Sequence, residues 1–340
     1  MQIPARFLPV FSRISGMISR LTSRLPRKPA SKRFVSGALI VSSFVFAVCA
    51  GILLFRLVIL PRQADASLDS ARSLYRGGPS SSSSSKPGSS SPAKRSTLSF
   101  AQLRAINPDV EGWITIPGTV VDYPVLRAPA SSPDYYLTHD WKRGTTKYGS
   151  IYQYPLPAKS QGERKNTILY GHSMKNGQMF ADLLQYDGLA YYRAHPVILY
   201  QENGSKAYWK IFAVIKANTD PAQGAPFDYQ KACFSSADSF LKYLYDVRVR
   251  SVVRTPVDLK TSDEILSLST CSYEFDGFRT VVFARRVRTG EDAEVDTAAA
   301  ETNGSALYPD CWYRTFGGTK PSLPDFRQAV KSGGFLRLAG

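Results

Sequence analysis

One uninterrupted apolar segment near the N-terminus constrains this chain more than any other feature. Residues 34–55 (FVSGALIVSSFVFAVCAGILLF) contain no charged side chain over 22 positions. As an α-helix this segment is about 33 Å long, which matches the hydrocarbon thickness of a bilayer. A cleaved signal peptide has a shorter apolar region, about 7–15 residues, followed by small residues at a cleavage site. Because the run here is longer and leads into Arg56 and Pro61, we favour an uncleaved signal anchor over residues 34–60.

The charges around this segment predict its orientation and account for most of the basic character of the chain. Of the net charge of +16, residues 1–62 contribute +10, because they hold ten Lys or Arg and no Asp or Glu. Eight of these cations precede the apolar segment, and positive flanks stay in the cytoplasm. Residues 1–33 are therefore predicted to be a basic cytoplasmic tail, with the bulk of the chain outside the cell membrane. The other 278 residues carry only +6, so the charge gives no support for nucleic-acid binding.

A change in composition marks the connection between the anchor and the rest of the chain. Residues 77–99 are almost all Ser, Gly, Pro and basic residues, with six consecutive Ser at 80–85. Such a segment has no aromatic side chain to bury and behaves as a flexible coil. Residues 61–99 are thus predicted to form an extracytoplasmic stalk with a flexible linker, which typically spans about 25–30 Å.

Short apolar segments separated by turn signals dominate from residue 100 onward. The sequence predicts strands at residues 112–119, 150–152, 167–170, 196–201, 207–216, 265–271 and 279–284. Apolar residues at helical spacing predict two helices, around 179–184 and 240–247, the second preceded by a sequence similar to a capping box at 235–238. The pattern indicates a mainly β domain with short helices, a barrel or a sandwich, over residues 100–290.

Three His and four Cys make the search for a reactive group short. No two of them have the spacing of two to four residues that is typical of zinc ligands, and the acidic residues show no calcium-loop spacing, so no metal or other cofactor is implied. Cys49 lies within the apolar segment, and Cys233 and Cys311 have no comparable context. Cys271 ends an apolar strand directly before a turn, where the backbone is fixed and the side chain accessible. Cys271 is therefore the candidate nucleophile.

A thiol that performs acyl transfer needs a partner for proton transfer and donors for the developing oxyanion. Arg279 begins the strand that follows Cys271, so its guanidinium returns to the same rim. His172 follows the strand at 166–170 through Gly171, which also places an imidazole at the end of a strand. On spacing alone two interpretations stay open: a catalytic Cys, His and Arg, or a buried core thiol with a structural imidazole.

Several motifs, in order along residues 100–288, resemble those of a class B sortase. They are NPDVEGWI at 107–114, DYPV at 122–125, YYLTH at 135–139, NTILYGH at 166–172, and LSTC at 268–271 with Arg279 eight residues after the Cys. The resemblance implies an eight-stranded sortase-type β-barrel, preceded by one N-terminal transmembrane helix. The connection around 217–258 looks like the insertion typical of class B. The resemblance also implies a membrane-anchored cysteine transpeptidase of a Gram-positive cell surface.

The same resemblance implies roles for individual residues. Cys271 is expected to attack a carbonyl in a sorting motif near the C-terminus of a secreted protein, and Arg279 to stabilise the oxyanion. His172 is expected to protonate the departing amine and to accept a proton from the incoming one, which an amine of peptidoglycan or of a pilin supplies. Ser269 and Thr270 flank the nucleophile as candidates for binding the peptide backbone, with ordinary strand residues as the alternative. His139 and His195 are expected to be structural, because neither falls on the catalytic His motif of the family. Arg285 and Arg286 are expected to lie away from the rim, because they are further along the strand.

Residues 291–340 extend beyond the region that resembles sortases. They begin with an acidic, Ala-rich stretch and continue into an aromatic cluster at 308–313. Two outcomes stay open for this extension, docking on the barrel or disorder. A disulfide between Cys233 and Cys311 is also open, because the domain is expected outside the cell.

Two other functions would use the same residues differently. A cysteine peptidase or peptidoglycan hydrolase would pass the acyl group from Cys271 to water, and only the acceptor distinguishes it from a transpeptidase. A surface binding module would leave Cys271 without a catalytic role. The spacing of Thr270, Cys271 and Arg279 argues against the binding module. We favour the transpeptidase, with the hydrolase next and the binding module last.

Overall fold

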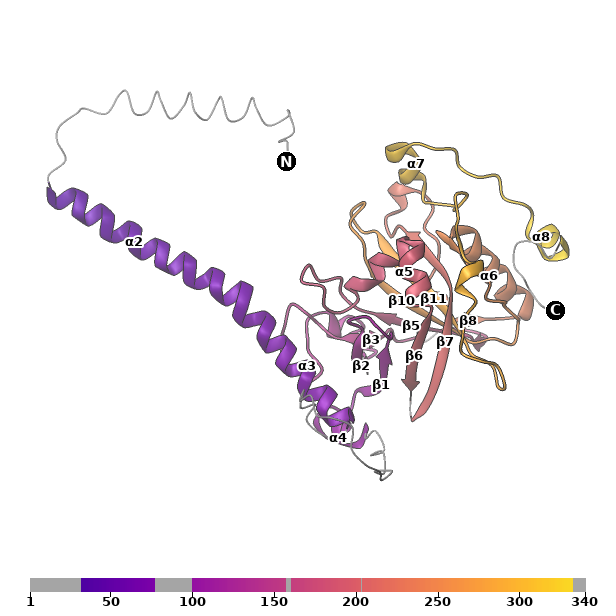
Figure 1. Cartoon of the computed structure of the whole chain (residues 1–340), viewed down its shortest axis with the longest axis horizontal. Helices are drawn as coiled ribbons and strands as arrows, with labels where there is room; N and C mark the ends of the chain where they lie inside the picture. The colour runs from indigo at the N-terminus through magenta and orange to yellow at the C-terminus, as the bar shows by residue number, and fades with distance from the viewer. Residues whose placement is uncertain (1–31, 77–99, 157–159, 203, 333–340) are drawn as a thin grey trace. The chain divides into compact units, whose positions relative to one another are not determined.

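The computed structural model describes residues 32–76, 100–156, 160–202 and 204–332 of the chain (Figure 1). Its contacts divide the chain into two units, Met1–Gln63 and Ala64–Gly340. The predicted basic tail up to residue 31 and the Ser-rich linker at 77–99 lie outside the described residues.

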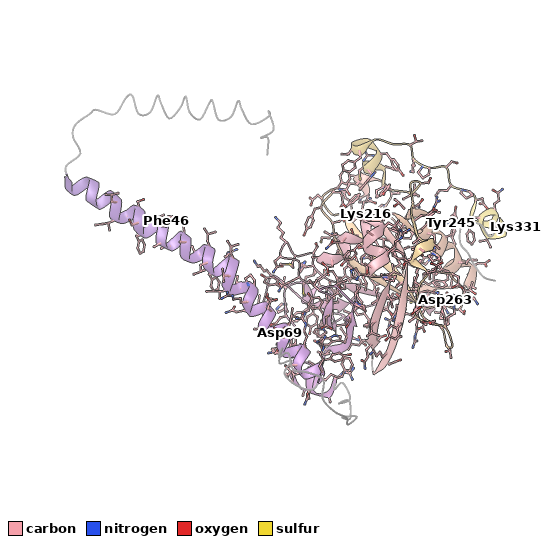
Figure 2. The ribbon with its side chains drawn as sticks, viewed as in Figure 1. Phe46, Asp69, Lys216, Tyr245, Asp263 and Lys331 are labelled. Carbon is pink, nitrogen blue, oxygen red and sulfur yellow. The ribbon has the colours of Figure 1, made fainter. Side chains whose placement is uncertain are left out.

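The first unit contains the apolar helix. It comprises α2 (Lys32–Leu54) followed by the π-helical segment η2 (Phe55–Ile59). Side chains 39–54 are all exposed, and Phe46, labelled in Figure 2, is 75% exposed. Large apolar side chains without protein contacts are unfavourable in water and favourable in lipid. Among the residues that the structure describes, one helix is long and apolar enough to cross a membrane.

The second unit begins within α3 (Leu60–Arg76). The end of this helix packs on the β domain: the Tyr75 ring stacks on Trp113 with centroids 4.1 Å apart, and its hydroxyl donates a 2.8 Å hydrogen bond to Gln201. The described part of the predicted stalk, residues 61–76, is helical.

Eight strands close into a barrel in the order β1-β2-β3-β5-β10-β11-β7-β6. Their bounds are Val110–Thr115 (β1), Asp122–Arg127 (β2), Ile151–Gln153 (β3), Asn166–Tyr170 (β5), Val197–Glu202 (β6), Ser205–Ala217 (β7), Ile265–Cys271 (β10) and Arg279–Arg286 (β11). The β2–β3 and β5–β10 pairs are parallel, and the other pairs are antiparallel. The predicted eight-stranded barrel is confirmed.

β2 is the barrel strand that the residue pattern alone did not predict. It contains Pro124, which lacks a backbone N–H and is confined to strand positions where no such bond is needed. Pro124 pairs with Trp113 of β1, whereas β3 pairs only with the three residues that follow it. The strand tolerates this proline because one side of it is unpaired at that position.

The core has two layers, one inside the barrel and one under a helix. Alternation along the strands turns residues such as Leu169, Leu268 and Val282 into the barrel interior. The opposite face of β7 and β11, including Phe212 and Phe283, is covered by α6 (Ala237–Arg250). The capping box of α6 joins Ser236 to Ser239, one residue later than the sequence predicted.

Short elements complete the second unit. The helices are α4 (Phe100–Ile106), η3 (Tyr135–Leu137), η4 (Ala181–Asp187), α5 (Leu189–Ala194), η5 (Pro221–Gln223), η6 (Thr297–Ala299), α7 (Asp310–Phe316) and α8 (Phe326–Ser332). Two small antiparallel sheets pair β4 (Glu163–Arg164) with β8 (Cys233–Phe234) and β9 (Val253–Arg254) with β12 (Glu301–Thr302). The helix predicted around 179–184 is the 3₁₀ helix η4.

The described part of the C-terminal extension, residues 291–332, docks on the β domain (Figure 1). β12 pairs with β9, and Leu307 N donates to Val249 O at 2.8 Å. Further along, Phe326 of α8 packs against Tyr245 of α6 with ring centroids 5.8 Å apart. Cys233 and Cys311 are both free thiols, so the disulfide left open by the sequence is not formed.

Candidate active site

Cys271 and Arg279 face each other across one antiparallel pair. Cys271 is the last residue of β10, Arg279 is the first residue of β11, and the two are direct partners in the register. Directly opposed residues present their side chains on the same face of a sheet, about 5 Å apart at Cβ. Both side chains are half-buried. The thiol and the guanidinium therefore share one rim of the barrel.

His172 reaches the same rim from the other neighbour of β10. β5 and β10 run parallel, with Tyr170 opposite Ser269. Because both chains continue in the same direction, His172 and Cys271 lie two residues beyond this pair at the same end. Gly171 precedes His172 in tight packing, since a Cβ there would approach Ile151 Cδ1 to 2.3 Å. The three predicted catalytic residues thus come from three adjacent strands.

The imidazole of His172 is held by a backbone carbonyl. Its Nε2 lies 2.7 Å from Leu137 O. A carbonyl only accepts hydrogen bonds, so Nε2 carries the proton in this contact and Nδ1 is left for proton transfer. This bond fixes the ring orientation, as a positioned acid or base requires.

The guanidinium of Arg279 is not paired with a carboxylate among the described residues. Its Nη1 donates to Phe278 O at 3.1 Å. Arg285 and Arg286, further along β11, are engaged elsewhere. Arg285 is 1% exposed and paired with Asp258 and Glu291, and Arg286 is paired with Glu264. Arg279 is thus the β11 arginine that can offer its guanidinium to a substrate oxygen.

Ser269 and Thr270 take different positions beside the candidate nucleophile, Cys271. Ser269 shares the face of Cys271 but is fully buried, and its Oγ has no hydrogen-bonding partner among the described residues. Thr270 points to the opposite face, inside the barrel, where its Oγ1 donates to Gly171 O at 2.8 Å. Binding of a peptide backbone by these two residues stays a prediction.

A buried cation that sequence analysis missed lies next to this rim. Lys216 of β7, labelled in Figure 2, has a side chain only 2% exposed. Its Nζ lies 2.7 Å from both Asp187 and Glu274 and donates to Thr280 Oγ1 at 2.8 Å. A Lys within the apolar strand 211–217 was the available signal, but its partners are distant in sequence. The ammonium anchors the segment between Cys271 and Arg279, because Glu274 belongs to it.

The two carboxylates respond differently to this shared cation. Burial raises the pKa of Asp187, and Lys216 only partly offsets this effect. For Glu274, burial acts in the same direction, but the hydrogen bond and the charge of Lys216 outweigh it and lower the pKa. The pKa values of the two carboxylates are therefore shifted in opposite directions, although both groups contact the same ammonium.

The other two histidines lie in structural positions. The His139 ring stacks on Tyr135 with centroids 3.9 Å apart, and its Nδ1 lies 2.8 Å from Tyr135 O. His195 ends α5, and its Nδ1 lies 2.8 Å from Pro117 O. Neither is on the three strands that carry the candidate site.

Comparisons with known proteins find similarity to sortases over the β domain. A family model described as "Sortase domain" matches residues 114–287, about half of the chain. Sortase B of Listeria monocytogenes is 37% identical over 174 residues, which cover 51% of this chain and 67% of that protein. Sortase B of Staphylococcus aureus is 29% identical over 191 residues, covering 56% and 75%. The X-ray structure of Clostridium perfringens sortase B aligns with a TM-score of 0.50 at 30% identity, covering 56% of this chain and 100% of that one.

Proposed function

The chain belongs to the sortase family, and from this premise we propose that Cys271, His172 and Arg279 perform its transpeptidation through a thioester. The family supports a cysteine transpeptidase for cell-wall anchoring. The observation that carries the assignment of residues is the pairing of Cys271 with Arg279, with His172 at the same end of the parallel neighbour.

The first half of the proposed reaction forms the acyl-enzyme. The Cys271 thiolate attacks the scissile carbonyl of a sorting motif, and a C–S bond forms as the carbonyl oxygen becomes an oxyanion. Arg279 donates hydrogen bonds to this oxygen, where positioned donors typically contribute about 10²–10³ in rate. The C–N bond then breaks, and protonated His172 gives its Nδ1 proton to the departing amine.

The second half transfers the acyl group. An incoming amine attacks the thioester carbonyl, neutral His172 takes the proton that this amine loses, and the C–S bond breaks to release Cys271. We propose that the donor is a secreted protein with a C-terminal sorting motif and that the acceptor is an amine of peptidoglycan or of a pilin. Water gives hydrolysis as the competing outcome.

The proposed topology puts this chemistry outside the cell. The apolar helix is followed by the β domain, and the eight cations before residue 34 favour a cytoplasmic N-terminus. The chain is then a single-pass membrane protein whose catalytic unit acts on substrates during or after their secretion.

Product analysis tests the proposed function. The purified full-length chain in detergent is incubated with a panel of sorting-motif peptides, with and without triglycine or diaminopimelate, and the products are identified by mass spectrometry. We expect a peptide–amine product that disappears in Cys271→Ala. Cys233→Ser is the matched control, because it removes another half-buried thiol and leaves the rim intact. Cleavage that ignores the amine would instead indicate a hydrolase.

A further inference from the structure

The C-terminal extension contacts the segment that joins the two catalytic strands. We call residues 272–278, between Cys271 and Arg279, the rim loop. Phe275, in the middle of this loop, lies against two aromatic rings of α7, with centroids 6.4 Å from Trp312 and 5.6 Å from Phe316. Trp312 and Phe316 also contact each other at 4.8 Å. The extension thus contributes an aromatic cluster directly to the loop that spaces the nucleophile from the arginine.

Tyr308 connects this aromatic cluster to the barrel. Tyr308 stacks on Trp312 with centroids 4.3 Å apart and nearly parallel rings, and it packs against the barrel core. The pKa of Tyr308 is raised, mainly by burial and to a smaller extent by the nearby carboxylates of Asp187 and Glu274. Tyr308 therefore sits beside the Lys216 ion pairs. The rim loop is held from within by Lys216 and from outside by the aromatic rings of the extension.

Residues 219–224 form a second connection between α7 and the rim loop. Thr219 Oγ1 donates to Gly277 O at 2.9 Å, and Gln223 Nε2 donates to Asp276 O at 2.7 Å. On the other side of this segment, Arg314 of α7 donates to Ala222 O at 3.3 Å. Gly224, with φ of +127°, lies so close to α7 that a Cβ would approach Asp310 N to 2.9 Å. The extension therefore supports both the rim loop and the segment that borders it.

We propose that the extension is a built-in brace of the catalytic rim, in which Trp312 and Phe316 are positioning residues that hold the rim loop and, through it, the spacing of Cys271 and Arg279. This inference rests on the proposed function of those two residues. Oxyanion stabilisation depends on donors that are already in place, so a loosened rim loop lowers the catalytic rate more than substrate affinity. The residues matched by the sortase family model end at 287, so the brace is a feature added to the matched domain.

The extension offers a matched control for this proposal. Phe326 of α8 also packs an aromatic ring on the domain, but its partner is Tyr245 of α6. Trp312→Ala and Phe326→Ala each remove one such ring from the extension. Only Trp312→Ala removes a contact with the rim loop.

The test measures both variants, and Phe275→Ala, in the full-length chain in detergent. We expect Trp312→Ala and Phe275→Ala to lower kcat about tenfold with KM changed less than twofold, and the double variant to lose no more than either single variant. We expect Phe326→Ala to keep the wild-type kcat even if its melting temperature falls. Equal kcat losses in Trp312→Ala and Phe326→Ala would overturn the proposal.

Hydrogen exchange separates failure of the brace from failure of the proposed function. The amides of Ser272 and Phe278 donate within the rim loop, to Phe278 O at 2.9 Å and Phe275 O at 3.3 Å. We expect exchange of a peptide covering 272–278 to accelerate at least tenfold in Trp312→Ala and to stay at the wild-type rate in Phe326→Ala. An unchanged rate in Trp312→Ala would refute the brace even if the wild type is active. If the wild type gives no amine product, the transpeptidase proposal fails, and this exchange rate still decides the brace.

Discussion

Thr270 and Gly171 are joined by a 2.8 Å hydrogen bond from a buried side chain to a backbone carbonyl. The bond connects the residue before the proposed nucleophile, Cys271, to the residue before His172. Since the two strands are parallel, it fixes how far each extends at the catalytic rim. The register of the proposed acid–base group and the nucleophile therefore depends on a residue that faces away from both.

Thr270→Val tests this positioning role. Valine preserves the shape but leaves Gly171 O without its buried donor, which costs about 1–3 kcal/mol. We expect the free energy of unfolding to fall by that amount and kcat to fall about tenfold, whereas Thr270→Ser retains most of both. Urea unfolding and steady-state kinetics give the two values. Equal kcat in Thr270→Val and wild type would show that the bond has no role in positioning.

Arg279 is expected to act in the transition state. Arg279→Ala should lower kcat by about 10²–10³, with a smaller change in KM, because the donors are needed once the oxyanion develops. Arg279→Lys keeps a charge but loses the planar fork, so it should recover only part of the rate. Arg286→Ala, on the same strand but paired with Glu264, serves as the control and should remain near wild-type activity. A rise in KM alone for Arg279→Ala would assign it to ground-state binding.

Lys216→Met should destabilise the domain in a pH-dependent way. It leaves the carboxylates of Asp187 and Glu274 facing each other without their cation, at a cost of about 3 kcal/mol at pH 7. In the wild type the pKa of Glu274 is lowered, so its stabilising contribution is lost as the pH falls below about 4.3. Without the cation, burial is expected to raise this pKa above its unfolded value, so we expect acidification to restore stability in the variant. Urea unfolding should show that the difference in the free energy of unfolding between wild type and Lys216→Met is smaller at pH 4 than at pH 7. A difference that does not change with pH would contradict the role of the ion pairs.

Glu291 should make the domain sensitive to acid. Hydrogen bonds from Arg285, and then from Lys210, lower the pKa of the Glu291 carboxyl despite its partial burial. Its contribution is fully present above its unfolded pKa of about 4.3 and is lost as the pH falls toward the lowered value. Glu291→Gln should therefore lose about 2 kcal/mol at pH 7 and less below pH 4. Thermal unfolding of both proteins across pH 3–7 measures this difference, and parallel curves would rule the contribution out.

Much of the catalytic rim could be predicted from local patterns. Cys271 and Arg279 bound two apolar segments with a short turn between them, so their proximity follows from a single hairpin. The position of His172 at the end of a strand made it a candidate, but only the resemblance to a family connected it with Cys271. Its strand lies about 100 residues earlier, and parallel pairing leaves no local signal. The sortase barrel itself is confirmed by the family match and by the topology.

The residues that sequence analysis missed have partners distant in the chain. Lys216 binds Asp187 and Glu274, which only the closed barrel brings together. The docking of Trp312 on Phe275 likewise joins the extension to the rim loop, and composition left its docking or disorder open. The observed capping box begins at Ser236, one residue later than predicted. Ser235 and Ser236 are equivalent as sequence signals, but only the hydroxyl of Ser236 accepts a hydrogen bond from Ser239 N.

The most direct test of the account is to trap the acyl-enzyme. The full-length chain is mixed with an intact sorting-motif peptide that it cleaves, in the absence of amine, quenched in acid, and analysed by intact mass and peptide mapping. We predict a thioester adduct on Cys271 that hydroxylamine releases. The His172→Ala and Arg279→Ala variants should accumulate this adduct more slowly than the wild type. An adduct on Cys233 or Cys311, or product formation by Cys271→Ala, would contradict it.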